Sequence, residues 1–238
     1  SLVPADVDVR ASGGGGMGAL GLTAVRDRIA TACRRAGRDP AGVQLVAVSK
    51  AASDGDILDA YADGHRDFGE NRAGDLAERA GRLPGDIRWH FVGRLQGNKV
   101  RRVRPATTLL HSLDRLELVG YWVKGPGLPP PALVQVNVAG EGQKAGIDPA
   151  DAEELVDEAL AAGIPVEGLM TMAPLVDDPE EARPVFRALA DLRDDLVRRH
   201  PTVRHLSMGM TDDFEVAVEE GATILRVGRA IFGPFPEG

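Results

Sequence analysis

The stretch LVAVSK, residues 45–50, joins the pattern of a buried strand to a terminal lysine. A short apolar run rich in valine is typical of a strand covered on both faces, as in parallel sheets. A lysine ammonium is costly to bury without a partner, so Lys50 is expected where such a strand ends at a polar edge. The stretch therefore predicts a core strand that delivers a lysine to a surface or to a site.

Seven further runs repeat this pattern, each followed by a polar or glycine-containing turn. The runs after the first are RDFGEN (66–71), RWHFVG (88–93), TLLHSL (108–113), ALVQVNV (132–138), VEGLMTM (166–172), RHLSMGM (204–210) and TILRVG (223–228). Residues 20–36, 148–162 and 180–199 show helical periodicity, with Asp148 as an N-cap and Pro149 and Pro184 near first turns. Eight strands alternating with helices predict a single (β/α)8 TIM-type barrel with an extra N-terminal helix. An open doubly wound sheet, which needs fewer strands, is the alternative.

The first 18 residues differ from the rest of the chain in composition, because they are rich in glycine and show no periodic spacing of apolar residues. We expect a flexible leader or an expression remnant there, with Met17 as a candidate native start. The barrel domain is then expected over residues 19–238.

Charge and composition exclude several classes of protein. The 238 residues contain 28 Lys plus Arg against 36 Asp plus Glu, a net charge of −8, which argues against general affinity for nucleic acid or anionic lipid. A local basic pocket for one small anion stays open. No apolar segment approaches the roughly 20 residues of a membrane span, and no secretory signal pattern is visible. With Cys33 as the lone cysteine, no internal disulfide can form, and we expect a cytoplasmic protein.

Polar and glycine residues collect at the predicted strand ends, where a barrel of this kind carries its site. They are Lys50, Glu70, Asn71, His90, Gly93, Gln96, His111, Ser112, Asn137, Met170, Thr171, residues 207–211 and residues 226–228. One polar strand end requires no function, but so many at one edge favour a site.

Lys50 has two interpretations. Partly apolar surroundings would disfavour its ammonium and leave an amine able to attack a carbonyl, which is Schiff-base chemistry. Alternatively, the side chain snorkels to the rim without a chemical role.

The last two strands favour the first interpretation. Ser207, Gly209 and Thr211, and then Gly228, lie in the loops that usually cradle a phosphate in this fold, because unpaired N–H groups there point at an anion. A reactive lysine facing a phosphate cradle suggests pyridoxal 5′-phosphate (PLP), which has both an aldehyde and a phosphate. A guanidinium from Arg226 at the pyridine nitrogen would keep that nitrogen unprotonated and weaken the ring as an electron sink.

Eight motifs together resemble the pyridoxal phosphate homeostasis proteins, single-domain relatives of the alanine racemase N-terminal barrel. The motifs are LVAVSK, FGEN, WHFVGRLQGNK, HSLDR, QVNVAGEGQKAGI, GLMTMAP, SMGMTDDFEVAVEEGAT and LRVGRAIFG, in order between about residues 20 and 234. The resemblance implies site roles as follows: Lys50 in the Schiff base, Asn71 and His90 beside the cofactor, Ser207, Gly209, Met210 and Thr211 around the phosphate, Arg226 at the pyridine nitrogen and Gly228 as a further phosphate donor.

The resemblance also implies a protein that binds PLP and acts in its homeostasis and in amino and keto acid balance, without turnover. PLP-dependent apoenzymes are its implied partners, and a monomer is expected. Tyr61 and Tyr121, the only tyrosines, both fall on predicted helices, so a second base for racemisation is not evident. A PLP-dependent amino acid racemase is the alternative. A barrel aldolase or phosphosugar enzyme using Lys50 directly is a third hypothesis.

Two other candidate motifs, a metal site and a P-loop, are not expected to be functional. His90 and His111 lie on different strands without a carboxylate at ligand spacing, so no metal site is expected. GEGQKAG, residues 140–146, lacks the Gly-Lys-Ser/Thr of a P-loop and is interpreted as the loop after the fifth strand.

Overall fold

The computed structural model, which describes residues 16–140, 142 and 145–234, contains a closed barrel of eight parallel strands. The strands follow one another around the barrel in sequence order: β1 (Gln44–Val48), β2 (Asp67–Glu70), β3 (Arg88–Phe91), β4 (Thr107–Leu113), β5 (Ala132–Gln135), β6 (Val166–Met170), β7 (His205–Ser207) and β8 (Ile224–Val227). Each of the eight apolar runs forms one strand, so the barrel prediction is confirmed and the doubly wound alternative is wrong.

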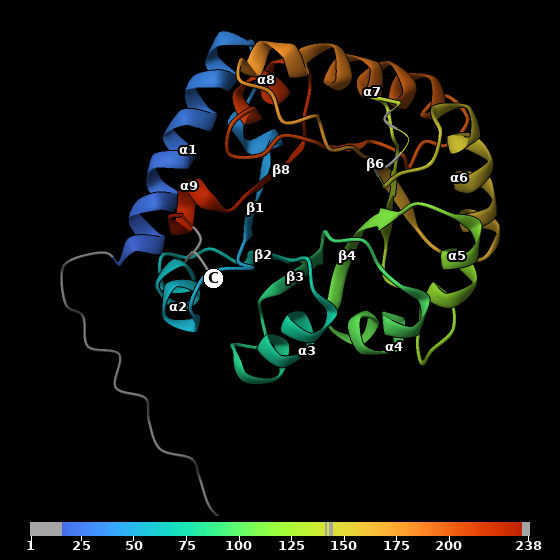
Figure 1. The fold of residues 1–238 in the computed structure, drawn as a ribbon, viewed down its shortest axis with the longest axis horizontal. Coiled ribbons are helices and arrows are strands. Elements are labelled where there is room, and N and C mark those ends of the chain that lie inside the picture. The colour runs from blue at the N-terminus through green and yellow to red at the C-terminus, as the bar shows by residue number, and fades with distance from the viewer. Residues whose placement is uncertain (1–15, 141, 143–144, 235–238) are drawn as a thin grey trace, which may run out of the picture.

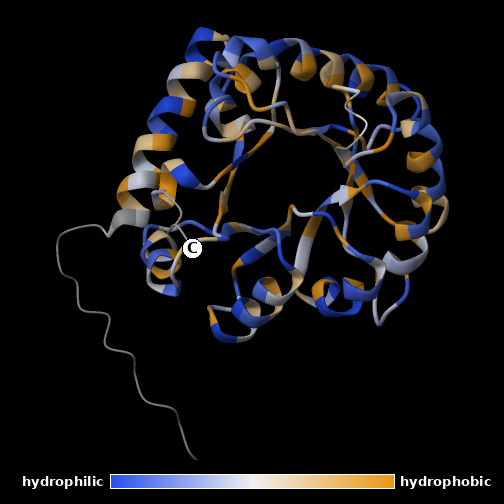
Figure 2. Cartoon of the chain, viewed as in Figure 1, coloured by the Kyte–Doolittle hydropathy of each residue, from blue (hydrophilic) through white to orange (hydrophobic). Residues whose placement is uncertain are grey.

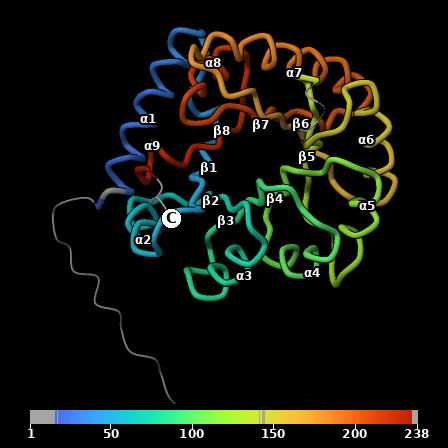
Figure 3. Tube along the Cα trace, in the orientation of Figure 1, coloured from blue at the N-terminus to red at the C-terminus, as the bar shows by residue number. Residues whose placement is uncertain are grey.

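Helices surround the strands (Figures 1 and 3). They are α1 (Met17–Arg35), α2 (Asp54–Ala62), α3 (Ala73–Arg82), α4 (Val100–Val103), α5 (Leu116–Trp122), α6 (Ala152–Ala161), α7 (Arg183–Leu196), α8 (Phe214–Glu219) and α9 (Arg229–Phe232). Short 3-10 turns occur at Pro40–Gly42, Gly97–Lys99, Arg104–Ala106, Pro149–Asp151 and Pro179–Ala182. None of these described helices has the length and hydropathy that a bilayer crossing requires.

Helix boundaries differ from the predictions by a few residues. The helices expected at 148–162 and 180–199 both open with a 3-10 turn, and Pro184 falls in the first turn of α7, where its missing N–H costs nothing. Of the expected leader, residues 1–15 lie outside the described part of the chain. Met17 and Gly18, at the end of the expected leader, are the first two residues of α1.

Side chains inside the barrel form layers. An apolar layer consists of Val46, Leu109, Leu133, Met170 and Ile224, contributed by five different strands. Because side chains alternate along a strand, the residues two positions further on also point inward, one layer closer to the carboxyl edge. On β4, β5 and β8 these residues are His111, Gln135 and Arg226, all buried. The layer above the apolar one is therefore polar, which is unusual for a core and marks the site.

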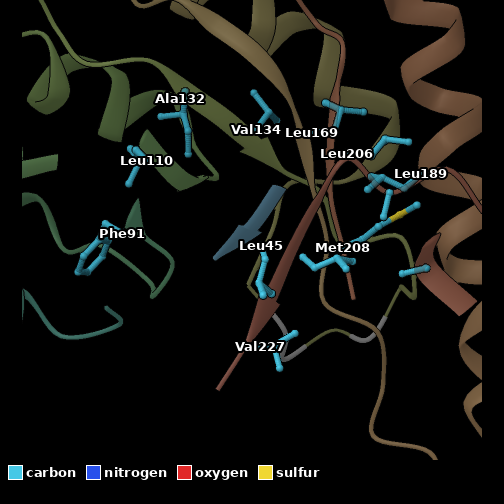
Figure 4. Packing of buried hydrophobic residues seen from close by; sticks show 14 of the residues in the cluster. Leu45, Phe91, Leu110, Ala132, Val134, Leu169, Leu189, Leu206, Met208 and Val227 are labelled. Carbon is cyan, nitrogen blue, oxygen red and sulfur yellow. The ribbon is translucent and has the colours of Figure 1, made fainter. Parts of the chain in front are cut away.

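The main core lies between the strands and the helices. Figure 4 shows part of it, with Leu45, Leu110, Leu169 and Val227 from the strands and Leu189 from α7. Figure 2 shows hydrophobic and hydrophilic residues alternating along the surrounding helices, as expected for helices with one face on a barrel. This apolar shell fixes the strands, so the polar layer inside does not have to supply the packing energy.

The barrel closes between its first and last strands. β1 pairs in parallel with β8, with Val46 opposite Arg226 and Ala47 opposite Val227. A Cβ atom on Gly228 would lie 2.9 Å from the carbonyl oxygen of Val48, which shows how closely the ends of the two strands approach. Closure therefore places Lys50, just beyond β1, beside the segment that follows β8.

The loop after β7 depends on Gly209. Its φ of +97° lies in the left-handed region that favours glycine, and a Cβ there would meet the Cβ of Ala217 at 2.6 Å. No side chain fits at this position without moving α8.

We predict that Gly209→Ala lowers the free energy of unfolding by about 1–3 kcal/mol, from backbone strain plus overpacking. The measurement is urea unfolding followed by circular dichroism. Gly120→Ala is the control, because Gly120 lies within α5 and a Cβ there meets nothing within 4 Å. That variant should be at least as stable as the parent, by up to about 1 kcal/mol. Equal stability of the two variants would contradict the prediction.

His65, at the amino edge of the barrel, is held neutral. Its Nε2–H donates to the carbonyl oxygen of Asp67 at 2.7 Å, and its Nδ1 accepts from Arg26 at 3.3 Å. Burial lowers the pKa of His65 to about 4, and the neighbouring Arg26 charge adds to the effect. A histidine that must charge on unfolding links stability to pH.

In the unfolded chain His65 has a pKa near about 6.5, so between that value and about 4 the unfolded state binds more protons than the folded state. Stability must therefore fall as the pH is lowered through this window. We predict a loss of about 2 kcal/mol between about pH 7 and about pH 5 from this residue. Urea unfolding at both pH values measures it, and His65→Gln should show a smaller loss. An unchanged loss in that variant would assign the pH dependence to other groups.

Candidate functional site

The carboxyl edge of the barrel gathers most of the sequence-predicted site residues. Lys50 lies two positions beyond the end of β1, and Asn71 lies one position beyond the end of β2. His90 lies within β3, Ser207 is the last residue of β7, and Arg226 lies within β8. Gly209, Met210 and Thr211 form the loop after β7, and Gly228 is the N-cap of α9. The fold thus brings together residues from both ends of the chain at one edge.

A chain of hydrogen bonds crosses the barrel interior from Arg226 to Asp67. Arg226 donates to Ser207 Oγ at 2.6 Å, and Ser207 Oγ lies 2.8 Å from His111 Nδ1. His111 Nε2 lies 2.9 Å from His90 Nδ1, and His90 Nε2 lies 3.1 Å from Asp67 Oδ1. Five residues from β8, β7, β4, β3 and β2 therefore form one connected polar network.

With both imidazoles neutral, the two ends of this chain fix the direction of every proton within it. A guanidinium only donates, so Ser207 Oγ accepts from Arg226 and passes its own hydrogen to His111 Nδ1. A carboxylate only accepts, so His90 donates to Asp67 through Nε2 and accepts from His111 at Nδ1. Each imidazole then carries its hydrogen on Nε2. The arrangement orients Arg226 without a carboxylate of the described residues in direct contact.

Burial and charge set the protonation of the network. Burial lowers the pKa of Arg226 to about 10, an effect that Asp213 partly offsets, so the guanidinium stays charged at neutral pH. Burial, with the nearby charge of Arg226, holds the pKa of His111 well below its ordinary value. Burial raises the pKa of Asp67, but hydrogen bonds from His90 and Arg88 lower it more, to well below its usual range. The network is charged only at its two ends.

The backbone around Lys50 is anchored by the buried Arg79. Arg79 pairs with Glu70 and donates to the carbonyl oxygens of Ser49 at 2.6 Å and Ala52 at 2.5 Å. Glu70 also accepts from Ser49 Oγ at 2.7 Å. The residues on both sides of Lys50 are therefore fixed, while the Lys50 side chain itself is exposed. The expectation of desolvated surroundings for Lys50 is wrong for this structure, because the lysine extends from a rigid loop at the mouth.

The loops after β7 and β8 are tied together. Thr211 Oγ1 accepts from the backbone N–H of Ala230 at 3.3 Å, and the N–H of Met210 donates to Asp213 Oδ1 at 2.7 Å. Among the described residues, no acceptor binds the N–H groups of Gly228 and Arg229, as expected at the start of a helix. These two amides can hold an anion, whereas the amide of Met210 is already used.

The structure refines the sequence-based residue set. Both ring nitrogens of His90 are used in hydrogen bonds within the network. His90 can therefore affect a ligand only by contact with its ring or indirectly, through Arg226. Gly209 has a packing role. Sequence reasoning missed Asp67 and Arg79, and it placed His111 among the polar strand ends without assigning it a cofactor role. The signal for His111 was its spacing of two from Leu109 on an inward-facing strand. Asp67 and Arg79 gave no such signal, because their partners are distant in sequence.

No group of three or more His, Cys, Asp or Glu side chains suited to a metal ion occurs in the described part of the chain.

Comparison with known proteins assigns a family. The chain matches the family described as alanine racemase, N-terminal domain, over residues 20–236. A curated relative from Aquifex aeolicus, named pyridoxal phosphate homeostasis protein, is 42% identical over 218 residues, which cover 89% of this chain and 96% of the relative.

Two solved structures share the fold and about a third of the sequence. An unknown protein from Bifidobacterium adolescentis has a TM-score of 0.86 at 34% identity, covering 91% of this chain and 94% of its own. PipY of Synechococcus elongatus, solved with PLP bound, has a TM-score of 0.75 at 34% identity, covering 88% of this chain and 100% of its own. This chain therefore belongs to the alanine racemase N-terminal domain family and, within it, to the pyridoxal phosphate homeostasis proteins.

Proposed function

We propose that this protein binds PLP as a Schiff base on Lys50 and acts in PLP homeostasis, by buffering or delivering the cofactor, without catalysing turnover. The observation that carries the proposal is the pairing of β1 with β8, which sets an anchored lysine beside a buried guanidinium and free amides. The relatives named for PLP homeostasis and the PLP-bound PipY structure support the same conclusion.

The residues present fit such a cofactor. A phosphate needs N–H donors, and the amides of Gly228 and Arg229 are available for it. Asn71 Oδ1 is buried without a hydrogen-bond partner among the described residues, which is costly unless a ligand supplies a donor. Lys50 provides an amine at the same edge. Asn71, Gly228 and Lys50 therefore have complementary roles open to one small molecule.

PLP supplies an aldehyde that condenses with an amine and a ring that withdraws electrons. Arg226 is positioned by Ser207 Oγ and by the carbonyl oxygen of Thr171 at 2.9 Å, which leaves further N–H groups for a ring nitrogen. A buried guanidinium disfavours a second positive charge beside it, so the ring nitrogen would stay unprotonated. That ring stabilises a carbanion poorly, which suits a protein that holds the cofactor.

The two tyrosines of the chain are engaged elsewhere. The Tyr61 hydroxyl donates to Asp86 Oδ1 at 2.7 Å, and the Tyr121 ring lies against Gly97 and near Lys124. A second acid or base for two-base racemisation is therefore not supplied by either. We propose further that the recipients are PLP-dependent apoenzymes, that the protein is a monomer, and that it acts in the cytoplasm, where its free thiol, Cys33, would stay reduced.

We predict that the purified protein, mixed with PLP and dialysed, keeps a visible Schiff-base absorption band at about one cofactor per chain. Lys50→Ala should lose the band, because no other lysine in the described part of the chain follows the end of β1. Lys124→Ala is the matched control and should keep it. If the wild type, Lys50→Ala and Lys124→Ala all lack the band, the cofactor assignment is wrong. An aldolase or phosphosugar enzyme that uses Lys50 directly would then be favoured.

Turnover is tested separately. We predict that the PLP-loaded protein, incubated with L-alanine in deuterium oxide, incorporates no deuterium at the α-carbon above the level of free PLP. The physical reason is the weak electron sink beside Arg226 and the lack of a tyrosine base. Nuclear magnetic resonance of the recovered alanine measures the exchange. Catalytic incorporation with loss of chirality would establish the racemase alternative instead.

A further inference from the structure

A cleft beside the candidate cofactor site is lined by an unusual number of cations. It has a volume of about 660 Å³ and lies between the start of α3 and the segment from β3 to α4. Figure 1 shows α3 and α4 side by side at this place. Its cationic lining residues are Arg72, Arg94, Lys99, Arg102 and Arg115. The chain as a whole has a net charge of −8, so this local excess of positive charge is contrary to the overall charge and points to an anionic ligand.

Three of these cations have no side-chain partner among the residues that the structure describes. Arg102 pairs with Glu78 at 3.1 Å, and Arg115 pairs with Asp114 at 2.5 Å. For Arg72, Arg94 and Lys99, by contrast, no ion pair or hydrogen bond from the side chain is found within the described residues. Like charges held around one cavity repel each other, so their placement costs stability unless an anion neutralises them.

The backbone adds to the same field. α3 has ten residues, and its N-cap residue, Arg72, makes no side-chain capping hydrogen bond. Its first N–H groups, together with the positive end of the helix dipole, therefore face the cleft at Ala73 and Gly74. At Gly74 the guanidinium of Arg102 lies 3.8 Å from where a Cβ would be, so the helix start and a cation converge at one point.

We propose that this cleft is a second anion site, which binds a small phosphate ligand carrying two or more phosphate groups, such as a diphosphate. A single carboxylate or phosphate is satisfied by one or two cations, whereas three unpaired cations and a helix start match a polyanion. Planar guanidinium groups also match phosphate oxygens in pairs. The volume lies in the range of about 300–1,000 Å³ that is usual for ligand pockets.

The cleft is distinct from the cofactor cradle. Neither Lys50, Ser207, Arg226 nor Gly228 lines it, and Asn71 is the one predicted cofactor residue that does. A ligand in the cleft would therefore lie next to the cofactor without displacing it. The proposal does not depend on PLP binding.

Isothermal titration calorimetry with inorganic pyrophosphate tests the proposal, on the wild-type protein with and without bound PLP and on Lys50→Ala. We expect one site per chain in all three, with a dissociation constant below about 1 mM at an ionic strength of about 0.15 M. The double variant Arg94→Gln/Lys99→Gln should weaken binding about tenfold or more and should retain PLP normally. ADP and citrate, tested as alternatives, separate a nucleotide diphosphate from any polyvalent anion.

The matched control is Arg101→Gln/Lys124→Gln. It removes one Arg and one Lys that are also exposed but do not line the cleft. Equal weakening in both double variants would show a general charge effect and overturn the proposal. Loss of pyrophosphate binding after PLP loading would place the ligand at Gly228 and overturn it as well. If pyrophosphate binds neither to the wild-type protein, with or without PLP, nor to Lys50→Ala, the proposal is also overturned. Citrate binding as tight as pyrophosphate binding would refute the phosphate assignment.

Discussion

The buried positive charge of Arg226 is the constraint on which the site depends. A guanidinium 5% exposed inside a barrel is costly, because little water solvates it and no carboxylate of the described chain contacts it. Ser207 Oγ and the Thr171 carbonyl oxygen replace part of that hydration. The Asp213 carboxylate offsets part of the remaining cost, and the relay through His111 and His90 ends in the Asp67 carboxylate. Each residue of the relay is therefore restricted in both type and tautomer.

This constraint explains why the barrel is built in two parts. The apolar shell between strands and helices supplies the packing, so the interior can hold a polar layer that would otherwise destabilise a core. On the mouth side of that layer, Arg79 and Glu70 fix the loop that carries Lys50. A rigid backbone with an exposed amine suits reversible covalent capture, since the amine can meet an aldehyde without first opening a pocket.

The fold was readable from the sequence because every strand is an apolar run bounded by turn residues. LVAVSK and TILRVG each predict one strand, and their number predicts closure. The candidate site was readable where a residue ends a strand, as with Lys50 and Asn71, since position alone places it at the mouth. Asp67 and Arg79 were not predictable, because their importance comes from partners on other elements. The exposure of Lys50 was also missed, since strand pattern does not reveal how far a side chain extends.

The pairing of the first strand with the last has a consequence for how the protein becomes active during its synthesis. Lys50 leaves the ribosome well before Arg226 and Gly228, because nearly the whole barrel separates them in the sequence. A nascent chain that lacks β8 has the lysine but neither the guanidinium nor the free amides beside it. If the chain holds PLP as proposed, retention would require β8, and products terminated before β8 would not sequester the aldehyde.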